Sequence, residues 1–322
     1  KDSILFFRLG DFYEMFFDDA KLASEELDLT LTGKDYGQDE RAPMCGVPYH
    51  SCESYISRLV SKGYKVAMCE QMELPSQAKG IVKREVVRII TPGTVTEDSM
   101  LDESRNNYLA SIYYSKKLGS AGACFCDIST GELKATEIKD HPSEVLNLLK
   151  NEIGKFSPTE VLVGGDIEFL EPLKSFFKDK LYCRIEVLDE DVSLEESKDI
   201  LKNHFKSEEI ERYSKETALR SLGNLFKYLK QTQKNDLSNI KDIHFFNNTE
   251  FMGLDLNTIR NLEIVETMRS KQKKGSLLWV LDKTKTPMGK RLLRSWVERP
   301  LLDVKKIGYR QEAIEEMVNE FE

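Results

Sequence analysis

The chain has 322 residues, of which 40% are hydrophobic and 32% charged, and its formal net charge is −8 at pH 7. This is the composition of a globular protein with room for two or three domains, so wholesale disorder is excluded. No apolar run approaches 18 residues and the chain does not open on a charged segment followed by an apolar one. The sequence therefore argues against a membrane span and against a visible secretion signal.

The six cysteines show no C-x-x-C spacing and no disulfide framework, and the four histidines have no metal-ligand spacing. We expect reduced cysteines, a cytoplasmic location and no zinc site.

The first 96 residues predict one small mixed α/β domain, because short apolar strands alternate with amphipathic helices. Asp18 or Asp19 is the expected N-cap of the first helix, and Gly63 is the expected C-cap of the second. The opening apolar segments flanking Gly10 read as strand. The predicted helices cover 18–28 and 52–62, and further strands cover 29–32, 64–72 and 82–90.

The rest of the chain predicts a linker at 97–106, a second α/β domain at 107–236 and a helical region at 237–322. Because the sequence opens in a strand and stops inside a helical pattern, we interpret it as a fragment. In the second domain the predicted strands are 108–114, 122–128, 132–138 and 160–163, and the helices are 141–155 and 217–231. In the third region the predicted helices are 258–270, 276–282, 287–296 and 311–321.

Charge is distributed unevenly along the chain. Residues 1–98 hold 12 Lys and Arg against 17 Asp and Glu, a balance of −5. Residues 257–310 hold 14 against 5, a balance of +9. A basic segment of this size is an electrostatic footprint that can face DNA, an acidic domain or solvent, and the sequence does not choose among them.

The segment Gly10-Asp11-Phe12-Tyr13-Glu14 stands out in the first domain. In an extended backbone Phe12 and Glu14 project from one face. An apolar ring can wedge between stacked bases, and a carboxylate can bond the base edge that the wedge exposes. The plain alternative is ordinary structure, in which the Phe is core and the Glu is a solvated surface residue.

The sequence resembles the MutS family of DNA mismatch-recognition proteins. The resemblance rests on the blocks 8–16, 41–50, 63–71, 86–94, 127–132, 260–263 and 275–282, which follow the family's order. It implies a multidomain α/β plus α fold. Residues 1–96 would be the mismatch-binding domain, 107–236 a ribonuclease H-like connector and 237–322 the start of the helical core or lever.

The resemblance also implies roles for two residues. Phe12 would stack on a mispaired base from the minor groove, and Glu14 would bond that base. A carboxylate near phosphates is electrostatically unfavourable, and a negative field with loss of water favours the neutral acid. We therefore hypothesise that Glu14 binds a mispaired base partly as the neutral acid and repels paired DNA as the carboxylate.

Cations near the wedge are needed to bind the DNA backbone. Lys83, Arg84 and Arg88 are the candidates, with Arg8 and Arg58 behind them. A period of two predicts that Arg84 and Arg88 share a strand face and that Lys83 points away. Tyr13 should point opposite to Phe12 and Glu14, into the core.

No ATP site is expected in this chain, because G-x-x-x-x-G-K-[ST] is absent from the sequence. By resemblance, ATP and Mg²⁺ belong to an ATPase domain outside these residues. The expected partners are mismatched double-stranded DNA and a MutL-family protein at the connector. Full-length members look like homodimers associated with the nucleoid, whereas this fragment is expected to be a monomer.

Two rival functions remain open. Asp127 and Glu132 could be paired carboxylates of a metal-dependent nuclease, although Asp127 also opens an ordinary Asp-x-Ser-Thr-Gly turn. The second rival is a scaffold that docks repair partners through the connector.

Overall fold

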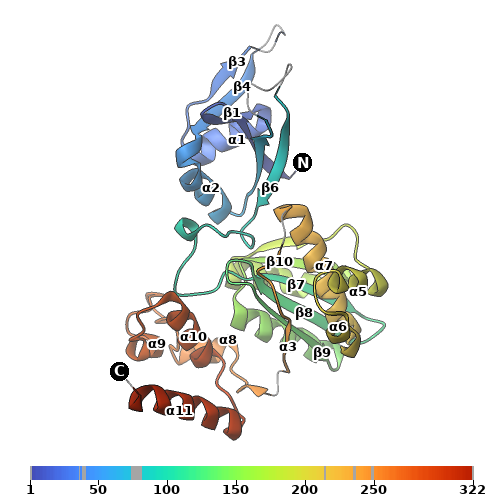
Figure 1. The fold of residues 1–322 in the computed structure, drawn as a ribbon, viewed down its shortest axis with the longest axis vertical. Coiled ribbons are helices and arrows are strands. Elements are labelled where there is room, and N and C mark those ends of the chain that lie inside the picture. Colours follow the sequence, from blue (N-terminus) through green and yellow to red (C-terminus); the bar gives the residue numbers. More distant parts are fainter. Residues whose placement is uncertain are drawn as a thin grey trace.

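The computed structural model describes residues 2–35, 37, 41–73, 82–213, 215–234, 237–247 and 250–320. Within them the chain forms two six-stranded sheets, each with its own helices, followed by a group of C-terminal helices (Figure 1). The multidomain α/β plus α fold predicted from the sequence is confirmed. None of the helices in the described ranges is long and apolar enough to cross a membrane.

The first sheet has the strand order β3-β4-β2-β1-β5-β6. β1 pairs antiparallel with β2 and parallel with β5. Helices α1 (Phe17–Leu27) and α2 (Cys52–Ser61) cover one face of the sheet, where they bury the core. The strands are β1 (Ser3–Leu9), β2 (Phe12–Phe16), β3 (Thr32–Lys34), β4 (Ala42–Pro48), β5 (Lys65–Gln71) and β6 (Arg84–Ile90).

Two local predictions for this sheet need correction. No side chain caps α1, and the Asp19 carboxylate instead accepts a hydrogen bond from the Leu5 amide at 2.9 Å. A tertiary contact with β1 therefore replaces the predicted cap. The strand expected at 29–32 forms at 32–34 as β3, because its register is set by pairing with β4. Gly63 follows α2 with φ +88°, as its predicted role requires.

The second sheet has the strand order β11-β10-β7-β8-β9-β12. Helix α3 (Pro142–Phe156) buries Val145 and Leu149 against one face, and α7 (Glu216–Gln233) buries Leu222 and Phe226 against the other. The strands are β7 (Leu109–Ser115), β8 (Ser120–Asp127), β9 (Glu132–Lys139), β10 (Glu160–Gly165), β11 (Arg184–Val187) and β12 (His244–Phe245). The remaining helices are α4 (Glu171–Phe176), a π-helical segment (Phe177–Leu181), α5 (Leu194–Lys202) and α6 (Ser207–Arg212).

Gly122 of β8 explains how closely α7 approaches this sheet. A Cβ atom at Gly122 would lie 2.0 Å from the carbonyl oxygen of Thr217 in the first turn of α7. Any other residue would push the helix away, so the glycine is required by packing.

The C-terminal region contains α8 (Leu256–Asn261), α9 (Leu277–Leu281), α10 (Pro287–Glu298) and α11 (Val304–Asn319). The helix predicted over 258–270 is wrong beyond 261. Glu263 has φ +49°, and the carbonyls of Glu263 and Ile264 accept hydrogen bonds from the amides of Leu277 and Leu278 at 3.0 and 2.8 Å. The backbone is thus bonded to the start of α9 instead of continuing its own helix.

Arg299 joins this helical region to the second sheet. Its guanidinium lies 4.7, 4.6 and 4.3 Å from the ring centroids of Phe156, Phe246 and Phe251, and it is 9% exposed. Cation–π contact at this burial favours one docked orientation of α10.

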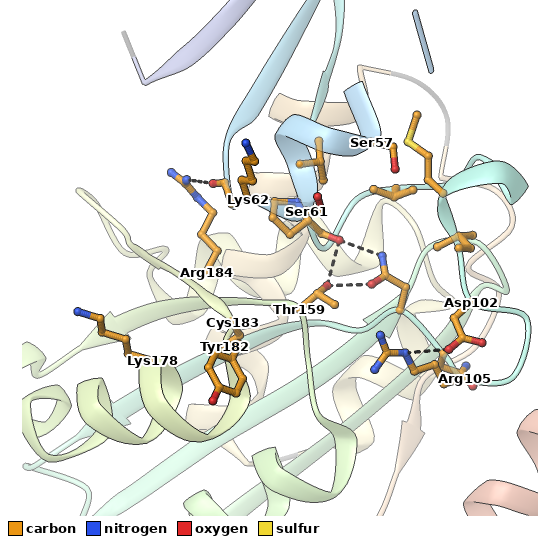
Figure 2. Close-up of a pocket in the computed structure, with 18 residues that line it drawn as sticks. Ser57, Ser61, Lys62, Asp102, Arg105, Thr159, Lys178, Tyr182, Cys183 and Arg184 are labelled. Atoms are coloured by element: carbon orange, nitrogen blue, oxygen red, sulfur yellow. Dashed lines mark hydrogen bonds and ion pairs between the residues drawn. The ribbon is translucent and has the colours of Figure 1, made fainter. Parts of the chain in front are cut away.

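A cavity of about 570 Å³ lies where α2, the segment around 92–107 and β11 meet (Figure 2). Arg184 reaches across it and donates a hydrogen bond to the carbonyl of Gly63 at 2.5 Å. Neither Phe12 nor Glu14 lines this cavity. It belongs to the junction between the sheets and lies apart from the predicted wedge.

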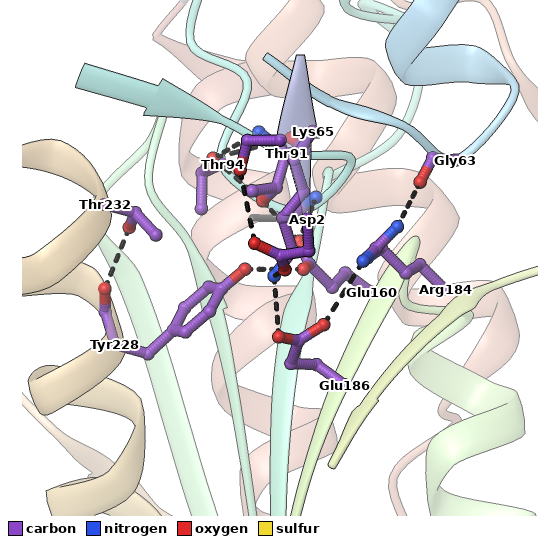
Figure 3. A network of polar contacts seen from close by, with 12 residues as sticks. Asp2, Gly63, Lys65, Thr91, Thr94, Glu160, Arg184, Glu186, Tyr228 and Thr232 are labelled. Carbon is purple, nitrogen blue, oxygen red and sulfur yellow. Dashed lines mark hydrogen bonds and ion pairs between the residues drawn. The ribbon is translucent and has the colours of Figure 1, made fainter. Parts of the chain in front are cut away.

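Polar contacts fasten the two sheets together (Figure 3). The buried carboxylate of Glu160 in β10 accepts hydrogen bonds from the hydroxyl of Thr91, the amide of Gly93 at 3.0 Å and the hydroxyl of Tyr228 at 2.7 Å. Burial raises the pKa of Glu160 in spite of these three donors. One carboxylate therefore links the turn after β6 to both β10 and α7.

Candidate nucleic-acid interface

The two faces of the first sheet carry different side chains. Tyr13 and Met15 point toward α1 and α2 and are buried, as predicted for Tyr13. Phe12 and Glu14 alternate with them on the opposite face, and Phe12 is 48% exposed, unusual for a phenylalanine. We call this opposite face the outer face. The outer-face residues used below are Phe7, Phe12, Glu14, Phe16, Lys34 and Arg84.

The turn that presents Phe12 is held from both sides. Gly10 has φ +58°, a conformation that favours glycine. Arg8 donates a hydrogen bond from Nε to the carbonyl of Gly10 at 2.5 Å, and its guanidinium lies 3.8 Å from the centroid of the Tyr49 ring. The Tyr49 amide donates to the carbonyl of Asp11 at 2.9 Å. Arg8 is therefore engaged in fixing the turn from which Phe12 projects.

Glu14 has a partner that sequence reasoning missed. Its carboxylate forms an ion pair with the ammonium of Lys34, and the two side chains are 17% and 42% exposed. The Lys34 ammonium also lies 5.5 Å from the centroid of the Phe16 ring. The sequence does hold one signal for this partner, because Lys34 lies in a short strand-like segment that follows the first helix. Only the pairing of β3 with β4, and of β4 with β2, brings it to Glu14.

Arg84 and Arg88 do not share a face, contrary to the prediction. Arg84 lies opposite Gln71 and Arg88 opposite Met68, because the register shifts between Met68 and Cys69. Positions 71 and 68 have opposite parity on β5, so their partners point to opposite faces. The extra residue in β6 is Val87, which the strand pattern alone did not reveal.

Arg84 lies on the outer face. Its guanidinium is 5.2 Å from the Phe7 ring, and Phe7 is the cross-strand neighbour of Glu14. Its Nε donates to the carbonyl of Arg8 at 2.9 Å. Arg88 instead binds Glu97 and donates to Gln233 of α7 at 3.0 Å. Only the first arginine is brought near the wedge.

The other two predicted cations are also not brought to the wedge. Arg58 lies on α2, on the helical side of the sheet, and donates to the carbonyl of Leu27 at 3.0 Å and to Asp28 at 2.9 Å. Lys83 precedes β6, is exposed and pairs with Glu85 at 2.6 Å. Arg58 thus joins two helices, and Lys83 is a solvated residue paired with Glu85, whose cross-strand neighbour is Glu70 of the helical side.

The carboxylates of the nuclease alternative have structural partners. Asp127 is 1% exposed and accepts hydrogen bonds from the amides of Asn107, Ser129 and Thr130 at 3.2, 2.9 and 3.3 Å. Glu132 accepts from the hydroxyl of Tyr108 and pairs with Lys134. The lone pairs that a metal would use are already occupied, which favours the turn over the nuclease.

The sequence has no phosphate-binding loop of the G-x-x-x-x-G-K-[ST] type, and the described ranges hold no cluster of three or more His, Cys, Asp or Glu placed to bind a metal. All six cysteines are free.

The basic segment at 257–310 contacts the predicted linker in part. Lys290 pairs with the Glu103 carboxylate at 3.7 Å, and Arg291 donates to the backbone carbonyl of Glu103 at 3.4 Å. Part of that segment therefore contacts the predicted linker.

Comparison with protein families gives three matches in order along the chain. The family model described as MutS domain I matches residues 1–99, MutS domain II matches 107–241 and MutS domain III matches 257–322.

Curated relatives match over the whole chain. A protein named DNA mismatch repair protein MutS from Acetivibrio thermocellus is 51% identical over 323 residues, covering 100% of this chain and 37% of the relative. Proteins of the same name from Ruminiclostridium cellulolyticum and Caldanaerobacter subterraneus are 51% and 49% identical, each with 100% of this chain and 36% of the relative covered. The chain thus spans little more than a third of the length of these relatives. With the three domains present in the family's order and about half of the residues identical, the chain belongs to the MutS family.

Proposed function

We propose that this chain recognises mispaired or unpaired bases in double-stranded DNA, by inserting Phe12 from the minor groove and bonding the base with Glu14. The observation that carries the proposal is the placement of a half-exposed Phe12 at a fixed turn, on the same sheet face as Glu14. The names of the relatives support the same process, DNA mismatch repair.

The energetics of wedge insertion favour mismatches. Unstacking and kinking a base step costs a few kcal/mol, and less where pairing is already broken. Stacking an aromatic ring on a base returns about 1–3 kcal/mol. The fixed turn lowers the conformational entropy lost on insertion, because Gly10 and Asp11 are already bonded to Arg8 and Tyr49.

Glu14 supplies discrimination in this proposal. As a carboxylate it repels the phosphates of paired DNA, and as a neutral acid it donates a hydrogen bond to a ring nitrogen of a mispaired base. Discrimination between mismatched and paired DNA should then fall as the pH rises from 5 to 8. A pH-independent ratio over that range contradicts this role.

The geometry changes which residues we propose to contact the DNA backbone. Arg84 and Lys34 lie on the outer face and are the cations best placed to reach phosphates beside the wedge. Arg8 acts on the turn, and Lys83 is an exposed neighbour at the sheet edge.

We propose the domain division 1–96, 97–106, 107–236 and 237–322 for these roles. Strand β12 (His244–Phe245) lies beyond the boundary at 236 but pairs with β9 in the connector's sheet. The full-length protein would bind ATP and Mg²⁺ in a separate domain, form a homodimer, associate with the nucleoid and dock a MutL-family partner on the connector. The present chain would be a monomer. A scaffold role for the connector is compatible with DNA recognition by the first domain.

The test is fluorescence anisotropy at low salt with a G·T or single-base-bulge duplex and its fully paired version. The parent chain should prefer the mismatched duplex, and Phe12→Ala should weaken mismatch binding about 5- to 150-fold, the equivalent of 1–3 kcal/mol. Tyr182→Ala is the matched control, because Tyr182 is a 75% exposed aromatic on the second domain. Equal affinity for both duplexes, unchanged by Phe12→Ala, would refute wedge recognition by this chain and leave the scaffold reading.

A further inference from the structure

Lys34 is the only cation that the described contacts place directly on Glu14. Its ammonium binds the Glu14 carboxylate and lies 5.5 Å from the centroid of the Phe16 ring. Glu14 is the more buried partner, with 17% of its side chain exposed against 42% for Lys34. The lysine is therefore free to move outward toward phosphate, whereas the glutamate is held in the sheet.

The other charged groups around Glu14 are engaged elsewhere. From β6, Arg84 is held over Phe7 and on the Arg8 carbonyl. From β5, Glu70 points to the helical side, where it accepts the hydroxyl hydrogen of Tyr13. The strand opposite, β4, presents Gly46 beside Glu14 and so contributes no charge.

Asp35 follows Lys34 and pairs with Arg41 at 3.7 Å. It therefore does not compete for the Lys34 ammonium.

We propose that Lys34 is a specificity-determining positioning residue for mismatch recognition, the counter-ion that pairs with the Glu14 carboxylate and that a mispaired base must displace. This inference rests on the proposed function of Phe12 and Glu14. It names the residue that a base must displace before it can bond Glu14. A base that bonds Glu14 competes with the Lys34 ammonium for the same oxygens. Lys34 also adds one positive charge beside the wedge, which attracts the phosphates of either duplex.

Removal of the Lys34 charge should have two effects, one on overall DNA affinity and one on discrimination between the duplexes. The Lys34→Met variant loses one phosphate contact, which weakens binding to both duplexes and lowers the salt slope by about one unit. It also leaves the Glu14 carboxylate without its cation, which favours the neutral acid beside DNA. Discrimination should therefore persist to higher pH than in the parent chain. Methionine is an unbranched apolar side chain that removes the charge and keeps most of the length of lysine.

The experiment compares the parent chain, Glu14→Gln, Lys34→Met and the double variant. Affinities for the G·T duplex and its paired version are measured by anisotropy from pH 5.5 to 8.5. At pH 8 we expect Lys34→Met to raise the mismatch-to-paired ratio about two- to fivefold, the scale of a partly exposed ion pair. In the Glu14→Gln background the same change should lower both affinities equally and leave the ratio unaltered.

Two further variants separate charge from structure. Lys34→Arg should restore the parent's pH profile. Lys21→Met is the matched control, because Lys21 pairs with Asp18 at 3.1 Å on α1, on the other side of the sheet. It should leave the ratio unchanged at every pH.

The outcomes are distinct. An equal loss of affinity for both duplexes in Lys34→Met at every pH overturns the inference and reduces Lys34 to a phosphate contact. If Glu14→Gln leaves the ratio and its pH dependence intact, the proposed role of Glu14 fails instead.

Discussion

The junction between the two sheets depends on one buried carboxylate, and Glu160→Ala should weaken it measurably. The substitution leaves the Gly93 amide and the Tyr228 hydroxyl without their acceptor, whereas the Thr91 hydroxyl retains Thr94 at 2.9 Å. Each buried unsatisfied donor costs about 1–3 kcal/mol. Relief of the buried charge offsets part of that sum, so we expect a loss of about 2–4 kcal/mol in the unfolding free energy of the junction at pH 7.

The stability lost in Glu160→Ala should be larger at low pH than at neutral pH. Burial raises the folded-state pKa of Glu160 above its ordinary value of 4.5. The stability that this shift contributes is therefore full below about pH 4.5 and declines as the pH rises through the folded-state value. The difference between the parent chain and Glu160→Ala should be larger at pH 5 than at pH 7.

Urea unfolding with a probe in each sheet measures the loss, and spin labels at Ser54 and Ser143, with Cys52 replaced by serine, report the distance between the sheets. Glu186→Ala is the matched control. Glu186 also crosses the junction, to Lys65 at 2.6 Å, but it is 23% exposed and should contribute at most about 1 kcal/mol. A loss below about 0.5 kcal/mol in Glu160→Ala, with an unchanged distance distribution, would refute the reasoning.

Three further predictions concern single positions. Gly122→Ala should lower the unfolding free energy of the second domain by about 3 kcal/mol or more in urea, because the new Cβ would lie 2.0 Å from the Thr217 carbonyl oxygen. An unchanged urea midpoint would contradict the close approach of α7. Gly10→Ala should cost about 1–2 kcal/mol in thermal unfolding and also weaken mismatch binding, since φ is +58° at the turn that presents the wedge; unaltered binding would mean that the turn does not position it. Lys273 and a threonine hydroxyl lower the pKa of Asp282 to about 2, so its contribution is full above about pH 3.8 and lost as the pH falls toward 2. Asp282→Asn should remove that acid-dependent change from the unfolding curve of the C-terminal region, and an identical pH profile would refute the assignment.

The sequence predicted most of the elements because their patterns are local. Alternation along β2 was sufficient to separate Tyr13 from Phe12 and Glu14, and the helices predicted at 141–155 and 217–231 form as α3 and α7. The helix expected over 258–270 failed because carbonyls near Glu263 bond the start of α9, a contact that no local pattern encodes.

The candidate site was only partly predictable for the same reason. Lys34 reaches Glu14 through two successive strand pairings, and their register is set by tertiary packing. The division between Arg84 and Arg88 depends on one unpaired residue, Val87, and a bulge leaves no reliable mark in a single sequence.

That unpaired residue changes how mutations along β6 should be interpreted. Before Val87, even-numbered positions such as Arg84 point to the outer face; after it, even-numbered positions such as Arg88 and Ile90 point to the helical side. A substitution scan across the strand should therefore invert its phase at residue 87. Changes that impair DNA contact would concentrate in the first half, and changes that loosen the junction with α7 would concentrate in the second. One strand thus contributes side chains to two different surfaces, the outer face before the bulge and the junction with α7 after it.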